Sequence, residues 1–274
     1  WTVPTGAANP GNVATFTTTI AGVYSVIITN TVTGCVSTSA SGTVSLSTNP
    51  TVTINSPTVC QGTPATVTAT PGAAGTYSYA WTVPTGVTNP GNVATFTTTV
   101  AGVYSVIITN TLTNCVSPSA SGTVTVNPNP TVTVNSPTVC AGASATVTAT
   151  PGVAGTYSYA WTVPTGATPP GDVATFTTTV AGVYSVIITN TLTNCVSTSA
   201  SGTVTINPNP TVSVNSPTVC DGASATVTAT PGVAGAYSYA WTVPTGAANP
   251  GNVATFTTTI AGVYSVIITN TATG

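Results

Sequence analysis

The sequence contains no lysine, arginine, histidine or glutamate, and only two aspartates among its 274 residues. An ordinary soluble domain is about 25% charged. Without cationic side chains the chain lacks the groups that neutralise phosphates, so we expect no nucleic-acid partner. General acid–base and nucleophilic catalysis need a titratable group beside the reacting atom. We therefore expect no catalytic residues and no enzymatic activity.

Metal, cofactor and membrane sites lack the residues they need as well. Calcium sites require several carboxylates and zinc sites require His or Cys clusters, yet no CxxC pair occurs. We expect no metal and no cofactor. No run of eighteen apolar residues occurs either, so we expect no membrane span in this stretch. The chain starts and stops within a repeat, as a window on a longer protein would.

What the chain does contain is one module, repeated. Its four tryptophans are evenly spaced, and each opens the sequence Trp-Thr-Val-Pro-Thr-Gly: Trp1, Trp81, Trp161 and Trp241. A fixed period of this kind is typical of an array of identical structural units. We expect two complete repeats, 49–128 and 129–208, between the C-terminal part of a repeat, 1–48, and the N-terminal part of another, 209–274.

The copies are nearly identical, which bears on the two acids. Asp172 stands where other copies have Asn12, Asn92 and Asn252, and Asp221 stands where they have Gln61 and Ala141. Catalytic acids need partnered titratable groups, and neither aspartate has one. We interpret both as drifted surface residues.

Alternating apolar residues and turn residues predict short strands within 49–128. The expected strands cover residues 51–55, 65–70, 77–83, 93–100, 103–109 and 122–126. Cys60 is expected in the turn after the first strand, and Val100 is expected to face inward. Asn127-Pro128-Asn129-Pro130 predicts a short, stiff junction, because proline fixes φ and donates no hydrogen bond.

About seven short strands without helical periodicity predict a small β-sandwich in each repeat. The fold class is therefore all-β, a tandem array of β-sandwich modules with an 80-residue period, and the resemblance given in the next paragraph makes these modules Ig-like (PKD-like). The expected core anchors are aromatic and recur in both complete repeats: Trp81, Phe96, Tyr104, Trp161, Phe176 and Tyr184.

Several segments also resemble a known family. Tyr79-Ala80-Trp81-Thr82-Val83-Pro84-Thr85-Gly86, Gly102-Val103-Tyr104-Ser105-Val106 and Asn114-Cys115 are similar to the PKD-like and Ig-like repeats of large bacterial surface proteins, especially those of Bacteroidetes. Gly102-Val103-Tyr104 also resembles the tyrosine corner of Ig-like folds. The resemblance implies secreted adhesins, stalks and surface fibres, and it implies no catalytic residues. The near-total loss of charge departs from that family.

Six cysteines recur at alternating short and long separations: Cys35, Cys60, Cys115, Cys140, Cys195 and Cys220. Without His or acid partners they predict disulfides, and hence an oxidising, extracellular setting.

The pairing of these cysteines stays open at this point. The family resemblance implies a pair within one copy, Cys60 with Cys115, although the two expected turns lie about 20 Å apart and a bridge needs Cα atoms within about 7 Å. Cys60 with Cys195 would join neighbouring copies. Cys115 with Cys140 is a third pairing, and bridges between chains are a fourth.

Threonine rows predict an unusual surface. Thr95, Thr97 and Thr99 would line one strand, and Thr66, Thr68 and Thr70 another. Such rows are similar to ice-binding surfaces, yet threonine also simply suits an exposed strand face. The hydroxyls are candidate acceptors for O-linked glycans, whereas no usable Asn-X-Ser/Thr sequon occurs.

Strand edges normally carry Lys or other charges that discourage pairing between molecules, and this chain has no Lys and only two acids. Either the edges are covered, by glycans or by neighbouring modules, or the chain associates. The sequence therefore favours self-association into a homopolymeric filament. We expect a non-enzymatic extracellular structural protein, a bacterial surface fibre, filament or sheath. The alternatives are a spacer stalk of a cell-surface adhesin whose binding domain lies elsewhere, and ice or glycan binding through the threonine rows.

Overall fold

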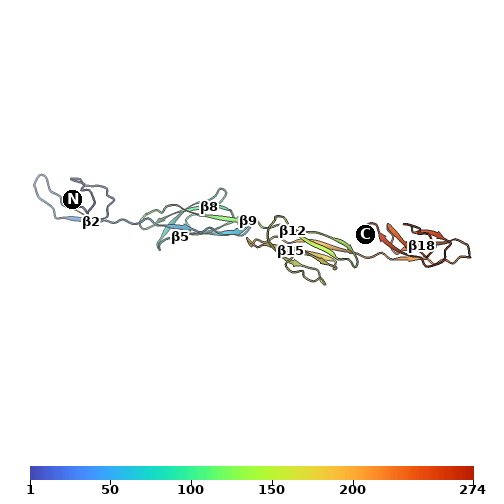
Figure 1. Ribbon diagram of the computed structural model, residues 1–274. Coiled ribbons are helices and arrows are strands. Elements are labelled where there is room, and N and C mark those ends of the chain that lie inside the picture. The colour runs from blue at the N-terminus through green and yellow to red at the C-terminus, as the bar shows by residue number, and fades with distance from the viewer. The chain divides into compact units, whose positions relative to one another are not determined.

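The computed structural model describes residues 1–274 and consists of 21 strands joined by turns and loops, without a helix (Figure 1). The chain divides into two compact units, Trp1–Asn127 and Pro128–Gly274.

The first unit contains nine strands: β1 (Gly22–Val26), β2 (Ala40–Val44), β3 (Val52–Ile54), β4 (Thr58–Cys60), β5 (Ala65–Pro71), β6 (Tyr77–Thr82), β7 (Thr95–Thr98), β8 (Gly102–Asn110) and β9 (Ala120–Asn127). The second unit contains the rest: β10 (Val132–Val134), β11 (Thr138–Cys140), β12 (Ala145–Pro151), β13 (Tyr157–Thr162), β14 (Thr175–Thr178), β15 (Gly182–Asn190), β16 (Ala200–Asn207), β17 (Val212–Val214), β18 (Ala225–Pro231), β19 (Tyr237–Thr242), β20 (Thr255–Thr258) and β21 (Ser265–Asn270).

Strands β3 to β9 form two facing sheets. One sheet has the order β3-β5-β7 and the other has the order β4-β9-β8-β6. All pairs are antiparallel except β4 with β9, which is parallel. These strands correspond to A-B-E and A′-G-F-C of an Ig-like sandwich. The second unit repeats the pattern as β10-β12-β14 and β11-β16-β15-β13. The chain is thus a tandem array of Ig-like sandwich modules.

The terminal repeats contain parts of the same module. Residues 1–48 hold the pair β1-β2, and residues 209–274 hold β17-β18-β20 and β19-β21. The repeat boundaries proposed from the sequence, at 48, 128 and 208, lie in segments without strand structure. They stay a prediction.

Two details of the predicted strands are wrong. Thr58–Cys60 forms strand β4 where a turn was expected, because these residues pair with the distant strand β9. Val100 is 40% exposed instead of facing inward. Strand β7 ends at Thr98, whose Oγ1 accepts the Val100 N–H at 3.2 Å, and this local turn takes the chain away from the sheet.

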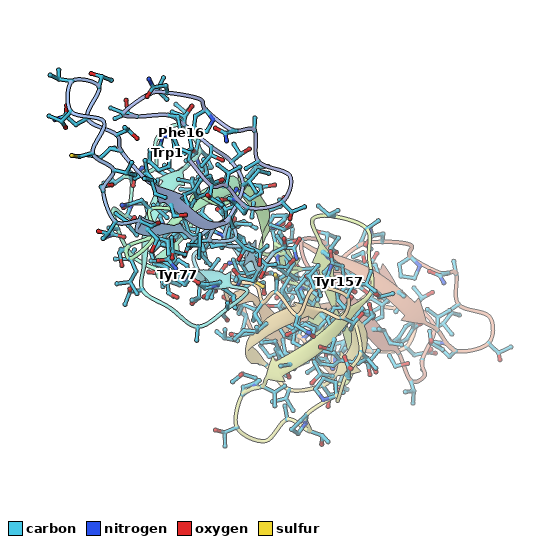
Figure 2. All side chains as sticks on the ribbon, turned by 90° about the vertical axis from the view of Figure 1, so that its left-hand side faces the viewer. Trp1, Phe16, Tyr77 and Tyr157 are labelled. Carbon is cyan, nitrogen blue, oxygen red and sulfur yellow. The ribbon has the colours of Figure 1, made fainter.

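The core of each module is an aromatic stack that joins its two sheets. Phe96, on β7 of the first sheet, packs against Trp81 and Tyr104, which lie on β6 and β8 of the second. The ring centroids are 4.9 Å and 5.7 Å apart. The Trp–Phe contact recurs at 4.9 Å in every repeat, including Trp1 with Phe16 (Figure 2). Such edge-to-face pairs add about 0.5–1.5 kcal/mol to the burial of their area.

Strict alternation completes the core around this stack. On β5 the buried residues are Ala65, Val67 and Ala69, with threonines between them facing out. On β8 the side chains of Val106 and Ile108 are buried, and Val103 between the turn and Tyr104 is exposed. Because successive side chains of a strand point to opposite faces, a one-residue shift in register would expose this whole set.

A tyrosine corner fixes the start of β8. Tyr104 is fully buried, donates its hydroxyl to the Val100 carbonyl at 2.9 Å, and lies 3.0 Å from Thr98 Oγ1. Gly102 has a φ of 145°, and a Cβ there would lie 2.7 Å from Pro84 Cγ. Only glycine tolerates both the backbone conformation and the contact.

We expect Tyr104→Phe to weaken β8 locally, because it removes the part-buried hydrogen bond to the Val100 carbonyl and the buried one with Thr98 Oγ1. The cost is about 1–2 kcal/mol. Hydrogen exchange of amides in β8 should then accelerate about 5- to 30-fold.

The same molecule supplies a control, since β15 should keep its protection. A second control is Tyr77→Phe, which removes only the solvent-accessible bond to the Ala73 carbonyl and should change exchange little. Equal effects of the two substitutions would contradict the role of the corner.

Candidate functional site

The cysteines lie at the ends of the modules and fall into two classes. Cys60 and Cys195 are disulfide-bonded. The remaining four are free thiols: Cys35, Cys115, Cys140 and Cys220. No cysteine lies on β5 or β8, the strands that an antibody-type domain links through its core.

A bridge within one copy is therefore wrong for Cys60 and Cys115. Cys60 pairs with Asn127 at one end of β9, whereas Cys115 precedes Ala120 at the other end. The length of the strand separates these ends by about 23 Å, far beyond the reach of a disulfide. The pairing of Cys115 with Cys140 is also wrong, because both are free thiols.

The turn after β8 holds its cysteine rigidly. Asn110 Oδ1 accepts the N–H groups of Leu112 and Thr113 at 2.9 Å and 3.1 Å. Asn114 adopts a left-handed φ of 56°, and the Asn110 N–H donates to the Cys115 carbonyl at 2.9 Å. The same contacts recur around Cys195, whose side chain is fully buried. Each turn thus presents one cysteine at a fixed position.

The threonine rows are brought together on one sheet face. In the register of β3, β5 and β7, the facing pairs are Thr53 with Thr70, Thr66 with Thr97, and Thr68 with Thr95. These side chains point away from the core, and five of the six are exposed. Thr99 lies beyond the end of β7 and is not part of this sheet. The repeat 129–208 has an equivalent face.

Few protein contacts occupy these hydroxyls. Thr95 Oγ1 reaches Thr68 Oγ1 at 3.4 Å, and Thr53 Oγ1 reaches the Thr70 carbonyl at 3.4 Å. Both distances exceed the usual range for a hydroxyl donor, so the bonds are weak. The face therefore offers a regular set of hydroxyls to solvent.

The strand edges are shielded mainly by uncharged groups. On edge strand β6, the Tyr79 N–H donates to Asn92 Oδ1 at 2.7 Å, and the Trp81 carbonyl accepts from Asn89 Nδ2 at 2.8 Å. The other edge strands, β3, β4 and β7, have three or four residues each. Short edges and covering loops both discourage pairing between molecules. Of the two outcomes that the sequence left open for the edges, cover or association, the short strands and loop contacts favour cover.

Asp172 takes part in this shielding. Its Oδ1 accepts the Tyr159 N–H at 2.6 Å, as Asn252 does for Tyr239. Asp172 is exposed, as expected of a surface residue. It also holds its loop against β13, so it has a structural role as well. Asp221 lies in an exposed turn. No group of three or more His, Cys, Asp or Glu lies close enough to hold a metal ion.

One cavity of about 710 Å³ opens in residues 214–264, between Val214, Ala225, Val227 and Tyr264. In the complete module 49–128 the equivalent space holds β9. A Cβ on Gly122 of that strand would lie 2.3 Å from the Asn55 carbonyl oxygen, and Val124 is part of the core. The cavity is thus the place of the last strand of the sandwich. We find no helix long and apolar enough to cross a membrane.

Known proteins give a limited comparison. No family model and no curated protein sequence matches the chain. Among solved structures, a variant of three titin Ig domains is 13% identical with a TM-score of 0.41, covering 81% of this chain and 94% of that one. Ig domains 1–5 of Sidekick-1 are 14% identical with a TM-score of 0.34, covering 94% and 65%.

The N-terminal eight Ig domains of Down Syndrome Cell Adhesion Molecule are 15% identical with a TM-score of 0.31, covering 84% of this chain and 39% of that one. The evidence for the Ig-like fold is the strand order within each module.

The edge contact of Asp172 predicts that two substitutions at this residue have different effects. Asp172→Asn should leave the protection of the Tyr159 amide unchanged, because Asn92 and Asn252 make the same bond. Asp172→Ala should raise the hydrogen-exchange rate of the Tyr159 amide about fivefold, for a loss of about 1 kcal/mol. Asp221→Ala is the matched control and should change nothing. An Asn variant that exchanges as fast as the Ala variant would show that the contact is not structural.

Proposed function

We propose that the chain is a non-enzymatic, extracellular structural protein whose repeats build a bacterial surface fibre, filament or sheath. The observation that carries this proposal is the near-identity of complete, self-contained modules with uncharged surfaces. An enzyme needs one site, whereas a fibre benefits from identical units along its length. The disulfide-bonded cysteines support an oxidising location outside the cytosol.

Self-association in this proposal uses faces instead of strand edges. The edges are short or covered, as described above, which disfavours β-sheet pairing between molecules. The outer surface still carries exposed apolar side chains, among them Val103 at 58% and Leu112 at 84%. With no charge to repel neighbours, such faces favour contact between copies.

A spacer stalk is the second candidate, and the junctions favour it. The segment that separates β9 from β10 is short and contains two prolines, Pro128 and Pro130. Such a segment is stiff and suits a chain that holds a binding domain away from a surface. A distinct, non-repeating domain elsewhere in the gene product would support this candidate.

The threonine faces support a surface role within either candidate. Their exposed hydroxyls are acceptors for O-linked glycans, which would hydrate an uncharged sheet. The regular spacing also suits ice or glycan binding, which thermal hysteresis and glycan arrays measure directly.

Electron microscopy of the native material tests the proposal. We expect ordered filaments with an axial spacing of one module. We also expect them to persist between low and high salt, because uncharged faces have little electrostatic attraction to screen.

Flexible strings without lateral order would favour the stalk and contradict the fibre. Filaments that dissolve as salt rises would contradict association through uncharged faces.

A further inference from the structure

We propose that each cysteine at the end of a β4-type strand bonds to the cysteine in the turn after the β8-type strand of the following repeat. Cys60 then pairs with Cys195, which lies in the next copy of the module. The proposal rests on the oxidising location proposed above. Each repeat is then attached to the next by a disulfide as well as by the backbone.

The set of bonded cysteines distinguishes the three registers that are possible within one chain. Pairing within one copy, as in Cys60 with Cys115, would bond Cys60, Cys115, Cys140 and Cys195. Pairing of Cys115 with Cys140, repeated along the chain, would bond all six.

The register that joins Cys60 to Cys195 has only one complete pair inside 1–274. At the same separation, the partners of the other four cysteines fall at positions −100, −20, 275 and 355. Only this register leaves four thiols free and bonds Cys60 and Cys195, as observed.

Cys140 provides a second observation, made within one compact unit. It is the equivalent of Cys60, and its Sγ lies 3.9 Å from the carbonyl oxygen of Thr273. Thr273 is the equivalent of Thr193, whose carbonyl lies 3.7 Å from Cys195 Sγ. Cys140 therefore already lies against the turn of the following repeat, just before position 275, where the repeat would place the next cysteine.

Cys115 gives the complementary observation within the other unit. Its Sγ lies 3.7 Å from the carbonyl oxygen of Ser47. Ser47 is the equivalent of Asn127, which is the residue paired with Cys60 in the β4–β9 register. Cys115 thus lies beside the place where the preceding repeat would end its own β4-type strand. Each of these two free cysteines thus lies where one end of a proposed bond would be.

Formation of the bond needs an oxidant, and a protein disulfide of an oxidising compartment has the required chemistry. The Cys60 thiolate attacks a sulfur of that disulfide and releases one thiolate of the oxidant. The Cys195 thiolate then attacks the Cys60 sulfur and releases the second. The two cysteines lose two electrons and two protons in total, and the oxidant leaves as a dithiol.

The proposed bonds limit the extension of the array. The bond from Cys60 ends at Cys195, and the next bond of the same series begins at Cys220. The series that includes Cys140 acts in parallel with this one. In each length of two repeats, the fully extended length is set by the short segment between Cys195 and Cys220. Its extended length is about 80–90 Å, compared with about 530–580 Å for two repeats without the bond. The array resists lengthening even where modules unfold.

Counting free thiols in the oxidised 274-residue chain tests the pairing. The chain is refolded with a disulfide oxidant, alkylated under denaturing conditions and analysed by mass spectrometry. We expect four alkylated cysteines, as in the structure. Cys60→Ser and Cys195→Ser should each leave all five remaining cysteines alkylated, because each removes the same bond. Cys115→Ser is the matched control and should leave three.

Peptide mapping identifies the bond directly, with chymotrypsin because trypsin has no site. The expected linked peptide joins Cys60 and Cys195. A peptide joining Cys60 to Cys115, or Cys115 to Cys140, would overturn the proposal. To show that the variants fold, hydrogen exchange should find the amides of β8, next to the Tyr104 corner, still protected. The result is independent of filament formation, since a chain that forms no filaments can still carry the bond.

Discussion

The stack of Trp81, Phe96 and Tyr104 is the contact on which each module depends. It places one ring of the β3-β5-β7 sheet against two rings of the other sheet, and the same contact recurs in every repeat. The tyrosine hydroxyl then ties the stack to the turn that starts β8. Because aromatic packing joins the sheets, no cysteine is needed in the core, and the cysteines are placed at the module ends.

The lack of charge affects the surface in two ways. Strand edges cannot use lysine to prevent pairing, so loop amides and a single carboxylate cover β6 and its equivalents while the other edges stay short. The faces, by contrast, have neither charge repulsion nor cover, and they present rows of hydroxyls and scattered apolar side chains. The modules are thus protected against edge pairing yet remain open to contact between faces.

More of the fold than of the site could be predicted from the sequence. Period-two alternation located six strands, since each buries alternate residues, and it placed Trp81 and Tyr104 on their strands. Strand β4 was missed because its short segment has no alternation of its own and pairs with β9, which lies far along the chain. The role of Asp172 was missed because Asp and Asn offer the same acceptor oxygen. The cysteine spacing alone fits three pairings within one chain, and only the state of each thiol distinguishes them.

Force spectroscopy tests the central claim, that a bond from Cys60 to Cys195 carries load past the modules. The 274-residue chain is pulled by its ends until it is fully extended, with and without a reductant. Reduction should lengthen the extended chain by about 450–490 Å, the length of the segment that the bond encloses. A gain of about 180–200 Å would instead indicate a bond between Cys60 and Cys115, and no gain would indicate no bond. Either result would contradict the account.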